Sequence, residues 1–240
     1  MTKYIASCSF GKDSLAMIIK IKELGMPLDE VIYCDIRFDD ESLSGETPEM
    51  REFIPKAEKI LKETFNIEVK RITSKKSFKE QFYTIKKRGK HIGDNYGFPY
   101  TIGAWCNSRL KIEPIREYLK QFKGEKIIQY VGIAYDEPKR YERLNHETHI
   151  APLYDLKITE KEALDICKKY DLLSPIYETS LRGGCWFCPK QRLSQLRQLY
   201  TEHRDLWDIL KKMEKDSFNT FRPNTTIEQL EERFKNEKEW

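Results

Sequence analysis

The 240-residue chain carries 43 lysine and arginine residues against 39 aspartate and glutamate residues, so its net charge of +4 does not by itself indicate a nucleic-acid-binding protein. Apolar residues make up 39% of the chain and charged residues 34%, which indicates a soluble protein, and no apolar run approaches the length of a membrane span. Because no signal-peptide core follows Met1, we expect a cytoplasmic protein whose six cysteines are thiols or metal ligands rather than disulfides.

Strand and helix patterns alternate along the chain. This alternation predicts an α/β fold, a doubly wound and mainly parallel sheet with helices on both faces, followed by a C-terminal helical extension. The capping pairs Thr159 with Glu162 and Thr225 with Glu228 mark two helix starts. We expect a nucleotide-binding domain at 1–175 and a cysteine-containing helical segment at 176–240. The expected strands are 3–8, 30–36, 67–72 and 126–133, and the expected helices are 14–24, 48–64, 159–170, 191–214 and a short one after Thr225.

The most informative motif is SCSFGKDS at residues 7–14, which joins the first strand to the first helix. A turn of this kind aims backbone N–H groups and the positive end of a helix dipole at an anion. Gly11 lets the backbone come close, and Lys12 adds a positive charge. Ser14 is placed to cap the helix, and Asp13 to act on a magnesium ion or on N–H groups of the turn. The spacing differs from that of a Walker A loop.

Two cysteines, Cys185 and Cys188, stand three residues apart, a spacing that lets both sulfurs bind one metal ion or cluster. Cys106 is the best third ligand, because it lies in the aperiodic stretch 90–108, which we expect to form an ordered loop over the active site. Three thiolates could hold a 4Fe–4S cluster with one open iron, remain metal-free thiols or a redox pair, or, less favoured, bind zinc. We expect the three sulfurs to converge near the phosphate-binding end of the sheet.

The remaining cysteines, Cys8, Cys34 and Cys167, fall in buried strands or on an apolar helix stripe, so we expect them to be core residues.

Basic residues form two sets at strand ends, Arg109 with Lys111 and Arg140 with Arg143. Guanidinium groups match phosphate or sulfate oxygens, although a surface ion pair of Arg140 with Glu137 is an equally good interpretation. A third group, at 86–90, could face a polyanion or simply be a solvated surface.

The turn resembles the Ser-Gly-Gly-Lys-Asp-Ser loop of the PP-loop superfamily, which grips the pyrophosphate end of ATP, with Phe10 in place of the first glycine. Together with the segments 33–35, 45–49, 106–111 and 132–140, its order and spacing resemble the phosphoadenosine phosphosulfate reductase family from residue 3 to about 215. The resemblance implies catalytic roles for Lys12, Asp13, Lys111 and Arg140. It implies nucleotide contacts from Ser7, Ser9, Phe10, Gly11, Lys12, Asp13, Ser14, Asp35, Arg109 and Arg143.

Two departures from the reductases favour ATP as the nucleotide. The chain keeps Lys12-Asp13-Ser14, and it has no cysteine after Cys188 that could serve as the reductases' C-terminal catalytic thiol. We therefore expect ATP with Mg²⁺ to be cleaved between its α and β phosphates in an adenylation that delivers sulfur to an unidentified acceptor, which could be a nucleic acid. A thiol-dependent reductase of phosphoadenosine phosphosulfate or adenylylsulfate and a non-catalytic nucleotide-sensing subunit remain alternatives, and a homodimer remains open.

Overall fold

The computed structural model describes residues 1–40, 43–99, 103–180 and 183–237. The chain divides into two compact units. The first unit comprises residues 1–35, 48–72 and 114–183, and the second comprises 36–47, 73–113 and 184–240. Among the described residues, no helix has both the length and the apolar character needed to cross a bilayer. The division predicted from the sequence, at residue 175, stays a prediction.

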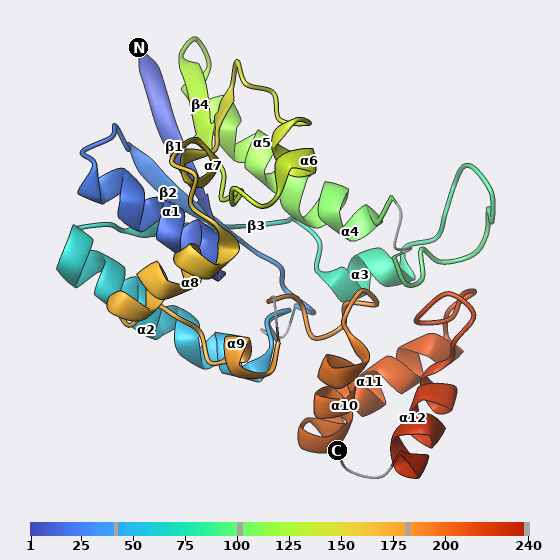
Figure 1. Ribbon diagram of the computed structural model, residues 1–240. Helices are drawn as coiled ribbons and strands as arrows, with labels where there is room; N and C mark the ends of the chain where they lie inside the picture. Colours follow the sequence, from blue (N-terminus) through green and yellow to red (C-terminus); the bar gives the residue numbers. More distant parts are fainter. Residues whose placement is uncertain (41–42, 100–102, 181–182, 238–240) are drawn as a thin grey trace. The chain divides into compact units, whose positions relative to one another are not determined.

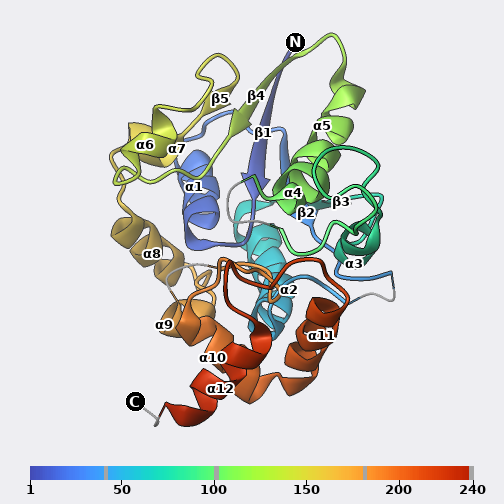
Figure 2. The same ribbon diagram turned by 90° about the vertical axis from the view of Figure 1, so that its right-hand side faces the viewer.

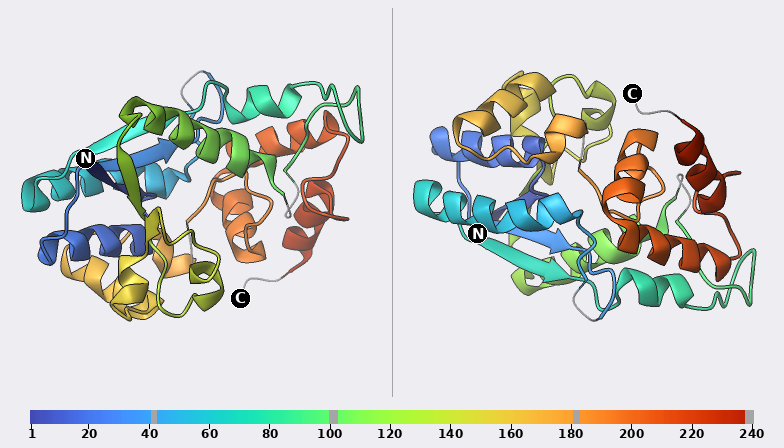
Figure 3. Two further views of the ribbon diagram at one scale, coloured as in Figure 1. Left: turned by 90° about the horizontal axis from the view of Figure 1, so that it is seen from above. Right: turned by 90° about the horizontal axis from the view of Figure 1, so that it is seen from below.

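The first unit is built on a five-stranded sheet with the order β3-β2-β1-β4-β5 (Figure 1). The pairings of β1 with β2, β1 with β4 and β4 with β5 are all parallel. Helix α1 packs against α7 and α8, and α5 lies on the opposite face of the sheet (Figures 2 and 3). This confirms the doubly wound α/β fold. The strands are β1 (Thr2–Cys8), β2 (Glu30–Asp35), β3 (Val69–Thr73), β4 (Lys126–Tyr130) and β5 (His149–Ile150).

The helices of the two units are short apart from α1, α2 and α11. Those along the first unit are α1 (Lys12–Glu23), α2 (Pro48–Phe65), α5 (Glu113–Leu119), the 3-10 turn Lys120–Phe122, α6 (Pro138–Tyr141), α7 (Pro152–Asp155), α8 (Glu160–Lys169) and α9 (Ile176–Thr179). Those of the second unit are α3 (Phe78–Tyr83), α4 (Trp105–Asn107), a π-helical turn (Ser108–Ile112), α10 (Leu193–Glu202), α11 (Arg204–Lys215) and α12 (Ile227–Asn236).

Local sequence signals fix several helix ends. The capping box of Thr159 with Glu162 starts α8 as predicted. The box that starts α12 joins Thr226 to Gln229, so the predicted pair one residue earlier is wrong. The reason is that this register makes Ile227 the first helical residue, which buries its side chain and lets its N–H donate to the Glu214 carboxylate at 2.8 Å.

The helix predicted for 191–214 is two helices, α10 and α11, because the backbone of His203 leaves the helical region at φ −129° and ψ 61°. The break lets Leu199 of α10 and Trp207 of α11 both enter the apolar cluster of the second unit. Burial of side chains from both helices thus decides the structure here, although the regular spacing of apolar residues predicts one continuous helix.

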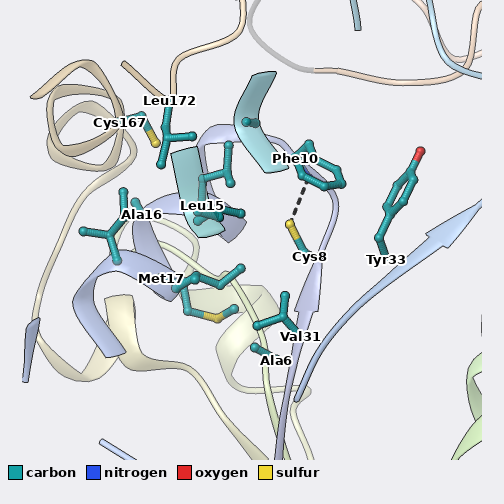
Figure 4. Packing of buried hydrophobic residues seen from close by; sticks show 14 of the residues in the cluster. Ala6, Cys8, Phe10, Leu15, Ala16, Met17, Val31, Tyr33, Cys167 and Leu172 are labelled. Carbon is teal, nitrogen blue, oxygen red and sulfur yellow. Dashed lines mark hydrogen bonds between the residues drawn. The ribbon is translucent and has the colours of Figure 1, made fainter. Parts of the chain in front are cut away.

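Each unit has its own apolar core. In the first unit the core gathers around α1 and the ends of β1 and β2, and Figure 4 shows part of it. In the second unit it is strongly aromatic, with the rings of Phe78 and Phe187 stacked 3.9 Å apart between centroids. Cys8, Cys34 and Cys167 are buried, which confirms their expected place in the interior.

Candidate functional site

The turn after β1 is held by hydrogen bonds between its own residues. Gly11 is the N-cap of α1, and the hydroxyl of Ser14 donates to the Gly11 carbonyl at 2.9 Å. The same hydroxyl oxygen accepts the N–H of Ser9 at 3.1 Å. Ser14 therefore lies inside the first helical turn and braces the loop from within, so the prediction that its side chain caps the helix is wrong. The helix begins at Lys12, two residues earlier than expected.

Phe10 occupies the position where the PP-loop pattern has glycine. Its φ of 53° is in the left-handed region, which costs a residue with a side chain about 1–2 kcal/mol. Its ring is fully buried and meets the ring of Tyr33 edge-on at 5.0 Å between centroids (Figure 4). Burial of the ring therefore offsets the backbone strain, and the turn keeps the glycine-like conformation without a glycine.

Substitutions at Phe10 should show this balance directly. Phe10→Ala and Phe10→Gly both remove the ring and should destabilise the protein, by roughly 3–5 kcal/mol for alanine. Glycine takes a positive φ without strain, so Phe10→Gly should be the more stable of the two by about 1 kcal/mol. Thermal melting of both variants measures the difference. Phe53, buried in helix α2, is the matched control, because there alanine should be the more stable. If Phe10→Ala melted at the same temperature as Phe10→Gly, the backbone at residue 10 would not be strained.

Lys12 brings a buried positive charge to the start of α1. Its side chain is only 7% exposed, and its Nζ lies 2.8 Å from Asp13 Oδ1 and 2.9 Å from Glu160 Oε2. Burial alone would lower the pKa of Lys12, but the hydrogen bonds to these two carboxylates outweigh it and raise the pKa above its usual value. Burial raises the pKa of Asp13, against the pull of the lysine. The ammonium group is therefore charged at neutral pH.

Two residues that the sequence analysis missed, Glu160 and Tyr177, complete this turn. Glu160 begins α8, and its own N–H donates to Asp136 Oδ1 at 3.0 Å. The N–H of Lys12 donates to the Tyr177 hydroxyl at 2.9 Å, so this hydroxyl sits at the N-terminus of α1. The capping box of Thr159 locates the start of α8, but nothing in the sequence indicates that this start faces the turn after β1.

The turn after β4 packs directly against the turn after β1. A Cβ atom on Gly132 would lie 2.9 Å from the carbonyl carbon and oxygen of Asp13 and from the nitrogen of Ser14. In the strand order, the chain leaves β1 toward β2 and returns at β4, so the topological switch point falls between β1 and β4. Parallel sheets of this kind bind ligands at such a point. Ser7, near the end of β1, and Asp35, at the end of β2, lie at this same edge of the sheet.

The exposed Arg140 is paired with Glu137, an acid whose charge acts on Asp13 of this turn. Its Nη1 is 2.6 Å from both carboxylate oxygens of Glu137, and Glu137 in turn raises the pKa of Asp13. The structure therefore contains the ion pair that the sequence offered as the alternative to an anion contact. Arg143 is exposed. The anion-binding roles of both arginines stay predictions.

The other predicted anion contacts, Arg109 and Lys111, belong to the second unit. Arg109 lies over the ring of Tyr96, 4.6 Å from its centroid, and its Nη2 donates to the Tyr96 hydroxyl at 2.7 Å. Lys111 is close enough to Cys106 and Cys185 to lower the pKa of both thiols, although burial raises each of them overall. A role for either residue at the nucleotide stays a prediction.

All three predicted ligand cysteines lie in the second unit. The N–H of Cys188 donates to the Cys185 carbonyl at 3.0 Å, which closes a tight turn, and Cys185 pairs with the backbone of Glu46. Cys106, on the short helix α4, packs against the same apolar cluster as Cys185. Burial raises the pKa of both the Cys106 and Cys185 thiols, and the neighbouring thiols raise them further. The three cysteines therefore lie near one another.

The spacing of the three sulfurs bears on what they could hold. Among the residues that the structure describes, these sulfurs do not all lie within 4.8 Å of one another. Sulfur ligands of a tetrahedral zinc ion are about 3.8 Å apart, as bond lengths near 2.3 Å require. As they lie, these three sulfurs could therefore not all bind one tetrahedral zinc ion.

Residues 3–191 match the sequence profile of the phosphoadenosine phosphosulfate reductase domain. The chain belongs to this family. Members of the family bind adenine nucleotides. A match over 189 of 240 residues takes in the turn after β1, the switch point and Cys106, Cys185 and Cys188.

Relatives extend over much of the chain but do not name its activity. An uncharacterised protein of Methanocaldococcus jannaschii is 25% identical over 210 residues, 83% of this chain and 39% of that protein. An uncharacterised nin region protein of Escherichia phage lambda is 31% identical over 102 residues, 42% of this chain and 34% of that protein. The chain thus spans well under half the length of these relatives.

Among solved structures, the U34-tRNA thiolase of Methanococcus maripaludis with its 4Fe–4S cluster is similar over 98% of this chain and 73% of its own, with 17% identity and a TM-score of 0.42.

Proposed function

We propose that the protein is a PP-loop enzyme that binds ATP with Mg²⁺ and cleaves it between the α and β phosphates to activate an acceptor for sulfur transfer. The observation that carries this proposal is the buried Lys12 ammonium group at the N-terminus of α1. It lies at the topological switch point, where the turn after β4 packs against the turn after β1. A charge, a helix N-terminus and a close backbone approach meet there, and together they suit a pyrophosphate group.

The present contacts of the turn indicate what a bound nucleotide would replace. The Tyr177 hydroxyl accepts the N–H of Lys12, so a phosphate oxygen could take over this hydrogen bond. A phosphate could likewise draw the Lys12 ammonium group away from Glu160, whose side chain is 45% exposed and can return to water. Asp13 and Glu160 would then be available to the magnesium ion of the MgATP substrate.

The chemical role of Lys12 follows from where charge develops. When the acceptor attacks the α phosphorus, negative charge builds on the departing pyrophosphate. Once nucleotide binding has turned the Lys12 ammonium group from Glu160 to the phosphates, it stabilises that charge without further reorganisation in the transition state, and the N–H groups of the turn add to the effect. Because burial strengthens the interaction with an anion, Lys12 is worth more here than an exposed lysine would be.

For the second unit, we propose that Cys106, Cys185 and Cys188 hold an iron–sulfur cluster that would handle sulfur during the transfer. The support is that Cys106 and Cys185 pack against one apolar cluster, that the thiols of Cys106, Cys185 and Cys188 lie close enough to affect one another's pKa, and that three thiolates suit a cluster with one open iron. Counts of iron, zinc and sulfide in anaerobically purified protein, wild type against Cys106→Ser, test this part. Stoichiometric zinc without sulfide would contradict it.

A reductase of phosphoadenosine phosphosulfate is the second candidate, because the family match includes that activity in its name. The retained Lys12-Asp13-Ser14 favours ATP instead, since a triphosphate needs more positive charge at the loop. Calorimetric titration separates the two. ATP should bind at least as tightly as phosphoadenosine phosphosulfate, and Mg²⁺ should strengthen ATP binding by offsetting charge on the triphosphate. Tight binding of phosphoadenosine phosphosulfate with no binding of ATP would overturn the proposal in favour of the reductase.

A further inference from the structure

Positive charge is concentrated in one short part of the second unit. Residues 75–90 contain seven lysines and arginines and one glutamate, a net charge of +6. Because the whole chain carries only +4, the other 224 residues together carry −2. Such segregation indicates a local electrostatic function rather than a uniformly basic protein.

Four of the seven cations lie on residues 84–97, which we call the basic finger and which, with Asp94, carry a net charge of +3. The finger follows α3 and folds back on itself (Figure 1). Its two sides are joined by backbone hydrogen bonds of 2.9 Å, from the Lys86 N–H to Asp94, and 3.0 Å, from the Tyr96 N–H to Thr84. At its tip Gly89, His91 and Gly93 all have positive φ, so the chain turns tightly. The finger therefore has a defined shape.

The finger is anchored to the loop between α11 and α12 within the same unit. The Lys86 ammonium group lies 3.7 Å from the centroid of the Phe218 ring, and the His91 ring lies 4.8 Å from that of Phe218. The side-chain amide of Asn95 donates to the Asp216 carbonyl at 2.6 Å. Lys86 thus anchors the finger, because its ammonium group forms a cation–π contact with the Phe218 ring.

The other three cations of the finger make no anchoring contact of this kind. Lys87, Arg88 and Lys90 are exposed, and none of the ion pairs or hydrogen bonds found in the described part of the chain involves their side chains. Some exposed lysines elsewhere pair with acids, as Lys59 does with Glu63, whereas others such as Lys56 pair with none of the described acids. Asp94, the one acid of the finger, pairs with His91 instead, 3.4 Å from His91 Nδ1. Three neighbouring cations without an ion pair repel one another, and a polyanion would relieve this repulsion.

We propose that the basic finger binds the phosphodiester backbone of a nucleic acid. Phosphates spaced regularly along a strand match three adjacent cations on a tight turn better than a single small anion does. An anionic lipid surface would be favoured by a broad apolar face beside the charges, whereas the finger exposes two large apolar side chains, Ile85 and Ile92, seven residues apart in the chain. The inference goes beyond the proposed ATP chemistry, which uses the first unit.

The test is fluorescence anisotropy with labelled single-stranded RNA, single-stranded DNA and duplex DNA across a range of salt. The variant replaces Lys87, Arg88 and Lys90 with glutamine, and the control replaces three exposed lysines of α2, Lys56, Lys59 and Lys62, in the same way. The finger variant should bind at least about tenfold more weakly at 0.1 M salt. Its slope of log K against log salt should fall by about 2 for a single strand, at about 0.7 per phosphate contact.

The outcomes are decisive in both directions. The proposal is supported if the finger variant binds the probes more weakly than the wild type, the α2 variant binds as the wild type does, and both variants keep the circular dichroism of the wild type. The probe that the wild type binds most tightly then identifies the nucleic acid. Equal losses in both triple variants, no binding by the wild type, or binding only to phosphatidylserine vesicles would overturn it. The finger variant should still release pyrophosphate from ATP. If the wild type releases none but binds the probes through the finger, the proposed ATP chemistry fails while the finger proposal stands.

Discussion

Replacing Lys12 with alanine should weaken MgATP binding by about 10- to 150-fold, which corresponds to a loss of roughly 1.5–3 kcal/mol for one charge-assisted contact. The effect should be large because the lysine side chain is 7% exposed and already fixed at the start of α1, so little water screens its charge. Isothermal titration with MgATP measures the loss. Lys20→Ala is the matched control, because this lysine lies on the same helix near its other end, where it pairs with Glu23.

The Lys12→Ala variant should remain folded. Removing the lysine side chain leaves the carboxylates of Asp13 and Glu160 without their cation. The Glu160 side chain can turn to water, and Asp13, whose pKa is raised by burial, takes up a proton more readily than usual. Circular dichroism and thermal melting check this point. ATP affinity equal to that of the wild type in a folded variant would remove the turn after β1 from the nucleotide site.

Gly132→Ala should damage the same site from the opposite side. Its new Cβ would lie 2.9 Å from backbone atoms of Asp13 and Ser14, and backbone atoms cannot rotate away as a side chain can. One of the two turns must therefore shift, at a cost of about 1–3 kcal/mol in stability. The shift moves the N–H groups that we assign to the phosphates, so ATP affinity should fall together with the melting temperature. Melting curves and ATP titrations on the same protein measure both.

Gly184→Ala is the control for this substitution, because a Cβ there would have no neighbour within 4 Å. It should leave both stability and ATP affinity close to those of the wild type. If Gly132→Ala behaved like the control in both measurements, the two turns would not pack as tightly as the account requires.

The fold could be predicted because its signals are local. The alternation of strand and helix patterns predicts the doubly wound sheet, Gly25 ends α1 at a φ of 63°, and the capping box of Thr159 starts α8. Each depends on residues a few positions apart. The errors at the starts of α1 and α12 are also local, because the residue that caps each helix lies only one to three positions from the predicted one. In α12, burial of the Ile227 side chain decides which residue is the cap.

The candidate site could be predicted only in part, because much of it depends on tertiary contacts. The motif at residues 7–14 indicates an anion site, but Tyr177 reaches the turn across 165 residues and Glu160 across 148. No pattern in the sequence predicts such pairs. The sequence does predict that Cys106 joins Cys185, but no pattern predicts that these cysteines lie in one compact unit and Lys12 in the other. Whether these sulfurs approach the phosphate-binding end of the sheet stays a prediction.

Product analysis is the most direct test of the central claim, that this protein cleaves ATP between its α and β phosphates. The protein is incubated with MgATP, and ³¹P NMR identifies the products for the wild type and the Lys12→Ala variant. Because water is the acceptor available in this sample, we expect pyrophosphate and AMP from the wild type and much less of both from the variant. Release of orthophosphate and ADP would contradict it, as would intact ATP when a parallel sample with phosphoadenosine phosphosulfate and a dithiol reductant yields adenosine 3′,5′-bisphosphate and sulfite.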